Sequence, residues 1–422
     1  MKKNLLLFPS ERMDNNKKSD RNENMLVRMS RATRESMGFT NTVEIFPTTS
    51  NIGDRLKKSM LLEIHQAFAS DLTSIKPKVK EEDLLRVGFV TTKTFKTVGG
   101  KGPACDLWIS DGVEDIPIGA DPEFLLFNGP NIVHANNVLS KANPVGSDGA
   151  MAELRPEPSL SPEGLVNNIR SLLVNNTESI KPYEWVAGCY YKDNVRDYPV
   201  GGHVHIGNPV NMARLELSDR ERCFKTINKI IDEYISIPMI KVDGTESGGS
   251  RRGKGMWKSF GYFGEMRLCS GRLEHRTLSG MWLTHPVLTA QVFGTIKSVV
   301  DEVYKHVADN KFNVEYMFPA NFRGVNVWAS NFEGWANIPL AKDMGCIKTS
   351  GEMAEKLVKS NAREITKPFL NSWYNKIKGL STYRKYSEHV DGLFDTLSHS
   401  QKVLENTEKR LKKTWLENAK FL

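Results

Sequence analysis

The stretch Arg272-Leu273-Glu274-His275-Arg276 has the alternating pattern of a β-strand with one strongly charged face. Because successive side chains of a strand point to opposite faces, the two arginines and the glutamate share one face and the leucine and histidine share the other. One carboxylate therefore lies between two guanidinium groups that keep their charge. Such a face suits a cation bound by the carboxylate and phosphate oxygens bound by the arginines. The alternative is an ion-pair ladder on a strand surface.

Two carboxylates occupy one face of another predicted strand, at residues 118–127. Asp121 and Glu123 are two positions apart, which is how a sheet presents oxygen ligands to Mg²⁺. The apolar run directly after them argues against the alternative, a strand with solvated acids. Pro122 has no N–H group to donate, so we expect this strand at a sheet edge or at a bulge.

Two further stretches combine polar residues in the same way. Glu153 and Arg155 share one face of a predicted strand, and His203 and His205 share one face of another, which follows Gly201-Gly202. A lone histidine on a strand is usually a hydrogen-bonded core residue. Two on one face, in a chain with paired carboxylates, favour metal binding.

A glycine-rich basic segment precedes the first stretch. Residues 242–265 contain seven glycines and the basic pair Arg251-Arg252. Glycine backbones with interleaved cations can fold over anionic oxygens, and a disordered basic loop is the equally open alternative.

The remaining pattern predicts an α+β domain. We expect one antiparallel sheet over residues 115–300, with helices on its outer face and the charged strands on its concave face. The Asn128-Gly129 pair predicts a hairpin, and Ser161 before Pro162 predicts a helix N-terminus. Apolar periodicity predicts helices at 162–176, 218–237 and 284–306.

Composition divides the chain into four regions. We expect a basic, disordered tail at 1–36, a small accessory lobe at 37–112, the main domain at 113–310, and a loop-rich cap with C-terminal helices at 311–422. Within the small lobe, a helix is predicted at 54–72 and a strand at 84–90.

Overall composition fits a soluble globular protein, with 39% hydrophobic and 26% charged residues among 422. A net charge of +8 is compatible with phosphate-bearing ligands or nucleic acid and names neither. Five scattered cysteines without a CxxC pair predict reduced thiols in a cytoplasm rather than disulfides or a zinc knuckle. We expect neither a signal peptide nor a membrane span, because the apolar runs are short.

The four polar stretches occur in an order that resembles the glutamine synthetase and glutamate–cysteine ligase superfamily. They are Asp121-Pro122-Glu123, Glu153-Leu154-Arg155-Pro156, Gly201-Gly202-His203-Val204-His205 and Arg272-Leu273-Glu274-His275-Arg276. Within that superfamily, the chain looks like the phage-encoded carboxylate–amine ligases of type 2, over about 115–300. The resemblance implies a glutamine synthetase-like antiparallel sheet. Asp-Pro-Glu stands where glutamine synthetase has Glu-x-Glu, and this departure leaves the exact ligation of the first metal open.

The resemblance also implies roles for individual residues. The implied metal ligands are Asp121, Glu123, Glu153, His203 and Glu274. The implied phosphate- and substrate-binding catalytic residues are Arg252, Arg267 and Arg276, and the implied ATP-binding residues are His205, Arg272 and Arg276.

The activity implied by the resemblance is an ATP-dependent ligation. A small-molecule or peptide carboxylate would be joined to an amine through an acyl phosphate, with two or three Mg²⁺ ions, or Mn²⁺. No membrane partner is expected, while nucleic-acid binding by the basic tail and oligomer formation stay open; a phage-encoded member would act in the host cytoplasm. Two other classes also stay open: a metal-dependent hydrolase or nuclease, and a non-catalytic structural or nucleic-acid-binding protein on a decayed ligase domain.

Overall fold

The protein is described from a computed structural model that covers residues 5–9, 43–47, 108–244, 251, 260–269, 271–322, 334–346 and 365–417. The chain divides into two compact units between Leu107 and Trp108. In the first unit, strands β1 (Leu5–Pro9) and β2 (Val43–Pro47) pair antiparallel. The helix and strand predicted within the small lobe lie outside the described residues, and the four-part division stays a prediction.

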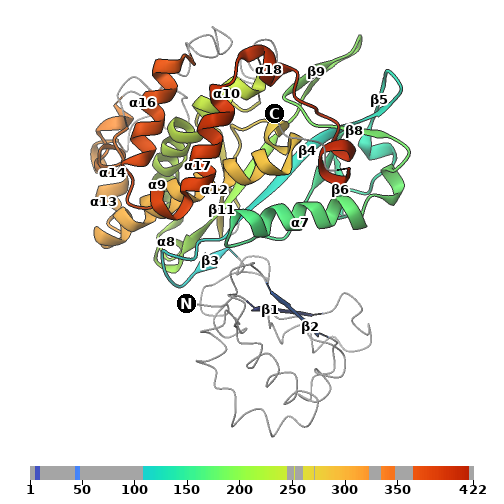
Figure 1. Cartoon of the computed structure of the whole chain (residues 1–422). Helices are drawn as coiled ribbons and strands as arrows, with labels where there is room; N and C mark the ends of the chain where they lie inside the picture. Colours follow the sequence, from blue (N-terminus) through green and yellow to red (C-terminus); the bar gives the residue numbers. More distant parts are fainter. Residues whose placement is uncertain are drawn as a thin grey trace, which may run out of the picture. The chain divides into compact units, whose positions relative to one another are not determined.

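The second unit is built on a large antiparallel sheet, whose main strand order is β12-β13-β11-β4-β7-β6 (Figure 1). These strands are β4 (Ile118–Asn128), β6 (Val145–Asp148), β7 (Met151–Leu154), β11 (Gly202–Pro209), β12 (Met266–Cys269) and β13 (Arg272–His275). Three short strands join this path: β5 (Asn131–Val133) and β8 (Glu184–Val186) pair with β4, and β3 (Ile109–Ser110) runs parallel to β11. A separate hairpin consists of β9 (Tyr190–Lys192) and β10 (Asp197–Pro199). The predicted α+β class and antiparallel sheet are confirmed.

The interior position of β4 contradicts the edge or bulge predicted from Pro122. This strand lies between β11 and β7. The N–H group of Glu123 donates to Gly201 O on the β11 side at 2.9 Å. Successive backbone N–H groups of a strand alternate in direction, so the missing donor of Pro122 falls on the β7 side. There the described pairing between β4 and β7 begins only at Glu123, opposite Glu153, and the proline therefore removes no ladder bond.

Local sequence signals account for the turns and helix starts. The Asn128-Gly129 hairpin forms as predicted, with Gly129 at a φ of +58° and Asn128 paired with Asn131. Helix α7 (Pro162–Asn175) begins after Ser161, whose side chain accepts a 3.0 Å hydrogen bond from the N–H group of Gly164.

The other two predicted helices form and are longer than predicted. Helix α9 (Leu217–Ile231) continues through the π-helical turn η4 (Asp232–Ser236) into α10 (Ile237–Asp243). Helix α12 (Pro286–Asp309) begins after His285, which caps the N–H group of Val287. Shorter elements of this part are α8 (Val210–Ala213), α13 (Val314–Met317), α14 (Pro339–Asp343), η2 (Ala135–Asn137), η3 (Glu178–Ile180), η5 (Gly280–Thr284), η6 (Ala320–Phe322) and η7 (Trp335–Asn337).

The face of the sheet that packs against helices is apolar. Phe124, Val204 and Leu273 come from three neighbouring strands and are fully buried in one core that includes side chains of α7, α9 and α12. His275 also lies on this face, where its ring nitrogens are 2.7 Å from Asn228 Oδ1 and 2.8 Å from Ser236 Oγ. It is therefore a hydrogen-bonded core histidine, and burial lowers its pKa.

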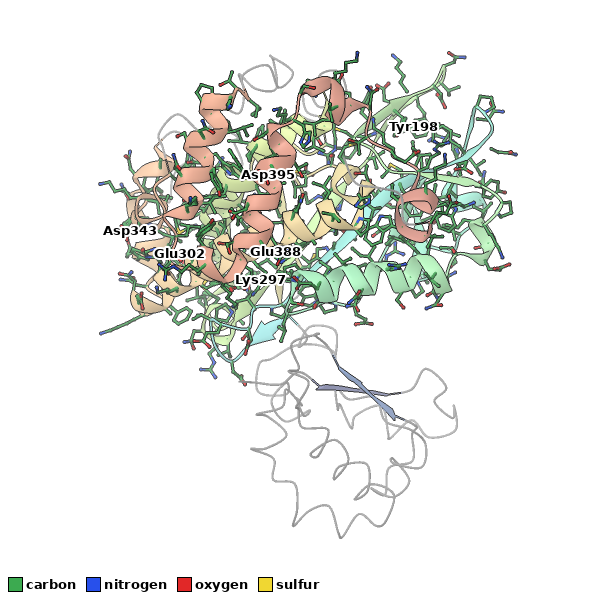
Figure 2. The ribbon with its side chains drawn as sticks, in the orientation of Figure 1. Tyr198, Lys297, Glu302, Asp343, Glu388 and Asp395 are labelled. Carbon is green, nitrogen blue, oxygen red and sulfur yellow. The ribbon has the colours of Figure 1, made fainter. Side chains whose placement is uncertain are left out.

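Of the C-terminal helices, α17 (Tyr383–Ser398) packs on α12 and α16 (Lys367–Lys378) packs on α17 (Figure 1). Helix α18 (Gln401–Glu405) contacts α10, and η8 (Lys412–Leu416) contacts α7. Figure 2 marks Lys297 and Glu302 on α12; Lys297 donates to Asp301 Oδ1 at 2.7 Å, and Glu302 accepts from the Thr382 N–H group at 3.0 Å. At the end of the described chain, the indole of Trp415 donates to Leu283 O at 2.7 Å.

Candidate functional site

The register of three strands brings the predicted polar residues together. On β11, His203 lies opposite Asp121 of β4, and His205 lies opposite Glu274 of β13. Because their neighbours Val204 and Leu273 point into the helix-side core, alternation places these polar side chains on the opposite face. The sheet thus converts stretches that are far apart in sequence into one cluster.

Asp121, His205 and Glu274 form the centre of this cluster. Each offers one ligand atom, and these atoms all lie within 4.8 Å of one another. Asp121 Oδ1 and His205 Nε2 are buried and make no hydrogen bond of good geometry within the described residues, although His203 Nδ1 lies 3.2 Å from Asp121 Oδ1 and His205 Nε2 lies 3.2 Å from Asp121 Oδ2. Unsatisfied buried polar atoms are costly, and a divalent cation bound by carboxylate oxygens and a ring nitrogen would satisfy both. The residues present therefore fit a metal ion.

His203 lies beside the same carboxylates. Its Nδ1 atom lies 3.2 Å from Asp121 Oδ1 and 3.8 Å from Glu274 Oε1. Burial opposes ionisation of Asp121, but the nearby His205 and His203 outweigh it and lower the pKa of Asp121. Burial likewise opposes protonation of His203, and Asp121 outweighs it and raises the pKa of His203. The aspartate is therefore ionised over the physiological pH range.

Glu123 and Glu153 face each other on neighbouring strands and extend the cluster. Glu123 is 5% exposed and accepts a hydrogen bond from the Gly201 N–H group, and burial raises its pKa. Burial and the charge of Asp121 raise the pKa of Glu153 to about 7. Arg155 forms an ion pair with Glu153. The two glutamates thus form a like-charge pair that a cation would stabilise.

Arginines surround the buried carboxylate of Glu274, which is 0% exposed. Nε and Nη2 of Arg267 both lie 2.7 Å from its Oε2 atom, which also accepts a 3.0 Å hydrogen bond from the Cys269 thiol. Arg276 donates to Oε1 and, through Nε, to Glu265 Oε1 at 3.1 Å. Burial opposes ionisation of Glu274, yet its pKa is lowered because Cys269, His205 and Arg276 outweigh burial.

Beyond Glu274, the cluster adjoins a cavity of about 200 Å³ lined by Asn208, Arg220, Phe224, Leu268, Cys269 and Arg272 among others. The guanidinium of Arg272 stacks on Trp108, 4.9 Å from the ring centroid, and Trp108 contacts His205 edge-on at 5.5 Å. Because Cys269 also contacts Glu274, the cavity and the carboxylate cluster are neighbours. The cavity combines two guanidinium groups with apolar walls, which suits a ligand with an anionic and an apolar part.

Of the predicted site residues, the structure gathers nine around this cluster and leaves one outside the described residues. Gathered are Asp121, Glu123, Glu153, His203, His205, Arg267, Arg272, Glu274 and Arg276. Arg252 lies outside. Sequence reasoning missed the partners that hold these residues, chiefly Cys269, Glu265 and Trp108. Only strand alternation offered a signal for Cys269, which lies on β12 two positions from Arg267.

One face of the antiparallel sheet carries four carboxylates, two histidines and several arginines. The protein is therefore an α+β protein with a site suited to cations and to anionic ligands. The chain belongs to the phage phiEco32-like COOH.NH2 ligase-type 2 family, whose sequence profile matches residues 118–332. This family is one of carboxylate–amine ligases, enzymes that form carbon–nitrogen bonds. The matched range contains every predicted site residue.

No curated protein matches the chain. Among the described residues, no helix has both the length and the apolar character needed to cross a membrane.

Proposed function

We propose that the protein is an ATP-dependent ligase that joins a carboxylate to an amine through an acyl phosphate. The observation that carries this proposal is the convergence of Asp121, His205 and Glu274, whose ligand atoms all lie within 4.8 Å of one another. A ligase must bring two anions, a carboxylate and a triphosphate, into contact. A cluster suited to cations and flanked by arginines meets that requirement.

The proposed reaction has two steps. A carboxylate oxygen of the acid attacks the γ-phosphorus of ATP, the bond to the β,γ-bridging oxygen breaks, and ADP leaves with the electron pair. The amine nitrogen then attacks the acyl carbon, the carbon–oxygen bond to phosphate breaks, and the nitrogen gives up a proton to solvent. Neither step requires a nucleophilic side chain from the protein.

The carboxylates and histidines would hold two or three divalent cations. We propose Asp121, His205 and Glu274 as the ligands of one ion, because one ligand atom of each lies within 4.8 Å of the other two. Glu123 and Glu153, which pair across β4 and β7, would hold a second ion. When bound, such ions neutralise the phosphate oxygens and position them for transfer. The sequence resemblance implied that His205 binds ATP and that His203 binds the metal. We instead propose His205 as the metal ligand, with His203 as a neighbour of the Asp121 and Glu274 carboxylates.

The arginines would divide the anionic groups among them. Arg276 is fixed by Glu265 and donates to Glu274, so it suits the phosphoryl group that is transferred. Arg272 and Arg220 line the cavity, which we propose for the nucleoside end of ATP. Phe224 gives this cavity an apolar wall for a base. Arg252 keeps its proposed substrate role.

The order of the four polar strands also supports a glutamine synthetase-like fold for the sheet. In the structure these strands are β4, β7, β11 and β13, and all four belong to one antiparallel sheet. We propose this fold, together with a cytoplasmic site of action.

A hydroxamate assay tests the proposal without knowledge of the natural amine. Hydroxylamine replaces the amine, a panel of carboxylic acids is supplied with ATP and Mg²⁺, and hydroxamate and ADP are measured together. We expect equal amounts of both with the correct acid, and loss of both in Asp121→Asn. Glu178→Gln serves as a control, since that side chain is 89% exposed.

Other outcomes of this assay would point to the other classes. ADP release that no acid stimulates would indicate a nucleotide hydrolase, and nucleotide-independent cleavage of phosphodiesters would indicate a nuclease. A folded protein that binds Mg²⁺ and ATP but yields neither product across the panel would favour the non-catalytic class.

A further inference from the structure

Arg267 holds its carboxylate partner in a different way from Arg276. Its side chain is 59% exposed, against 20% for Arg276. Arg276 has a second anchor in Glu265, whereas every hydrogen bond described for the Arg267 side chain goes to Glu274. Of the two guanidinium groups on this buried carboxylate, that of Arg267 is therefore the one free to leave.

The Oε2 atom of Glu274 has little room for another ligand while Arg267 is in place. It accepts hydrogen bonds from Nε of Arg267 and from the thiol of Cys269, and Nη2 of Arg267 lies 2.7 Å away. The Oε1 atom of Glu274 receives Arg276 and lies 3.8 Å from His203 Nδ1. A carboxylate oxygen has only two lone pairs, so a cation that binds Oε2 must displace Arg267 or the Cys269 thiol, whereas a cation on Oε1 would bind beside Arg276.

We propose that Arg267 and a divalent cation compete for Glu274, so that metal binding releases this guanidinium from the carboxylate. This inference rests on the proposed cation site at Asp121, His205 and Glu274. Once released, the guanidinium remains at the rim of the same site with its donors unpaired. There it can bind an anionic group of a substrate, so metal and anion binding would be coupled.

Mn²⁺ binding, measured from the electron paramagnetic resonance signal of the free ion, tests the competition without turnover. Arg267→Gln should bind Mn²⁺ more tightly than the wild type. Arg272→Gln is the matched control: it removes one positive charge from the same sheet, but that side chain stacks on Trp108. Because the Arg267 side chain is 59% exposed, solvent screens its pair with the buried Glu274, and we expect Arg267→Gln to exceed the control by about fivefold. Equal or weaker binding than the control would overturn the proposal.

Arg267→Lys retains the positive charge but replaces the planar guanidinium with a single ammonium group. The affinity of this variant for Mn²⁺ should therefore lie between those of the wild type and Arg267→Gln. A lysine variant that binds more tightly than the glutamine variant would contradict competition. Asp121→Asn separates this inference from the proposed function. If that variant binds Mn²⁺ as well as the wild type, the cation site itself is wrong and both proposals fail.

Arginine-specific labelling tests the release in the unaltered protein. Phenylglyoxal reacts with free guanidinium groups, and mass spectrometry of peptides reports each position. Labelling of Arg267 should rise severalfold when Mn²⁺ is added. Arg410, which pairs with Glu408 and is 46% exposed, should be unchanged. If Mn²⁺ binds and labelling of Arg267 does not rise above that of Arg410, the guanidinium is not released and the proposal is overturned.

Discussion

Replacement of Glu123 by glutamine should stabilise the metal-free protein. This side chain is 5% exposed and lies directly opposite Glu153 across β4 and β7. Directly opposed residues of antiparallel strands have Cβ atoms about 5 Å apart. Two unit charges at that separation repel by about 3 kcal/mol when the effective dielectric constant is about 20. Arg155, which pairs with Glu153, offsets part of this repulsion, so we expect a gain of about 1–2 kcal/mol in the free energy of unfolding.

The expected gain comes from charge alone, because glutamine is nearly isosteric with glutamate and its carbonyl oxygen can still accept from the Gly201 N–H group. Urea unfolding is measured in EDTA at a series of pH values from 7 upward, because burial raises the pKa of Glu123 and raises that of Glu153 to about 7, and the gain should grow as the two carboxylates ionise. The exposed control Glu178→Gln should change stability by less than about 0.5 kcal/mol.

Addition of Mg²⁺ should reverse the order of the two proteins. A ligand that binds only the folded state stabilises it in proportion to the logarithm of its concentration over the dissociation constant. Wild type should therefore gain stability in millimolar Mg²⁺, and Glu123→Gln should gain much less. If the glutamine variant is less stable than wild type in EDTA, the repulsion between Glu123 and Glu153 is not what the structure implies.

Three further predictions concern single residues. Arg276→Lys keeps a positive charge but loses the planar fork, so kcat of acid-dependent ADP release should fall about 10³-fold while KM for ATP changes little; equal turnover would exclude a role in phosphoryl transfer. In Gly201→Ala, the added Cβ would lie 2.8 Å from His203 Nε2. The rate of acid-dependent ADP release should therefore fall at least tenfold (about 1.4 kcal/mol), and an unchanged rate would mean that the His203 ring can shift freely. Burial lowers the pKa of Lys225 to about 7, below its ordinary value of 10.5. Between these two pH values the unfolded state binds more protons than the folded state, so the free energy of unfolding should rise with pH. Urea unfolding of Lys225→Met over that range should show a smaller slope, and an identical slope would refute this account.

Strand alternation and local capping rules predicted much of this structure because they depend on a few adjacent residues. The facing of His203 and His205 and the cap at Ser161 follow from local backbone geometry. The position of β4 did not follow from Pro122, because the harm done by a proline depends on the side to which its missing N–H group would point. That side is fixed only when both neighbouring strands are known.

The partners of the site residues could not be predicted, for a related reason. Cys269 contacts Glu274 because β12 and β13 pair in one particular register, in which Arg267 lies opposite Glu274. Trp108 meets Arg272 because β3 lies beside β11. A shift of one residue in either pairing would send these side chains to the other face, and sequence spacing alone does not specify the register.

The contact between Trp415 and Leu283 bears on how the chain folds during synthesis. Trp415 is 1% exposed, and its indole bonds to the carbonyl group that closes η5, just after the strand that carries Glu274. Nearby, Ala187 donates to Lys409 O, so the C-terminal segment also contacts the chain beside β8. Domains usually begin to fold while the ribosome is still adding residues. Here the core beneath the site cannot close until the final helices have left the ribosome, so nascent chains stalled before Lys409 should remain sensitive to protease and dependent on chaperones.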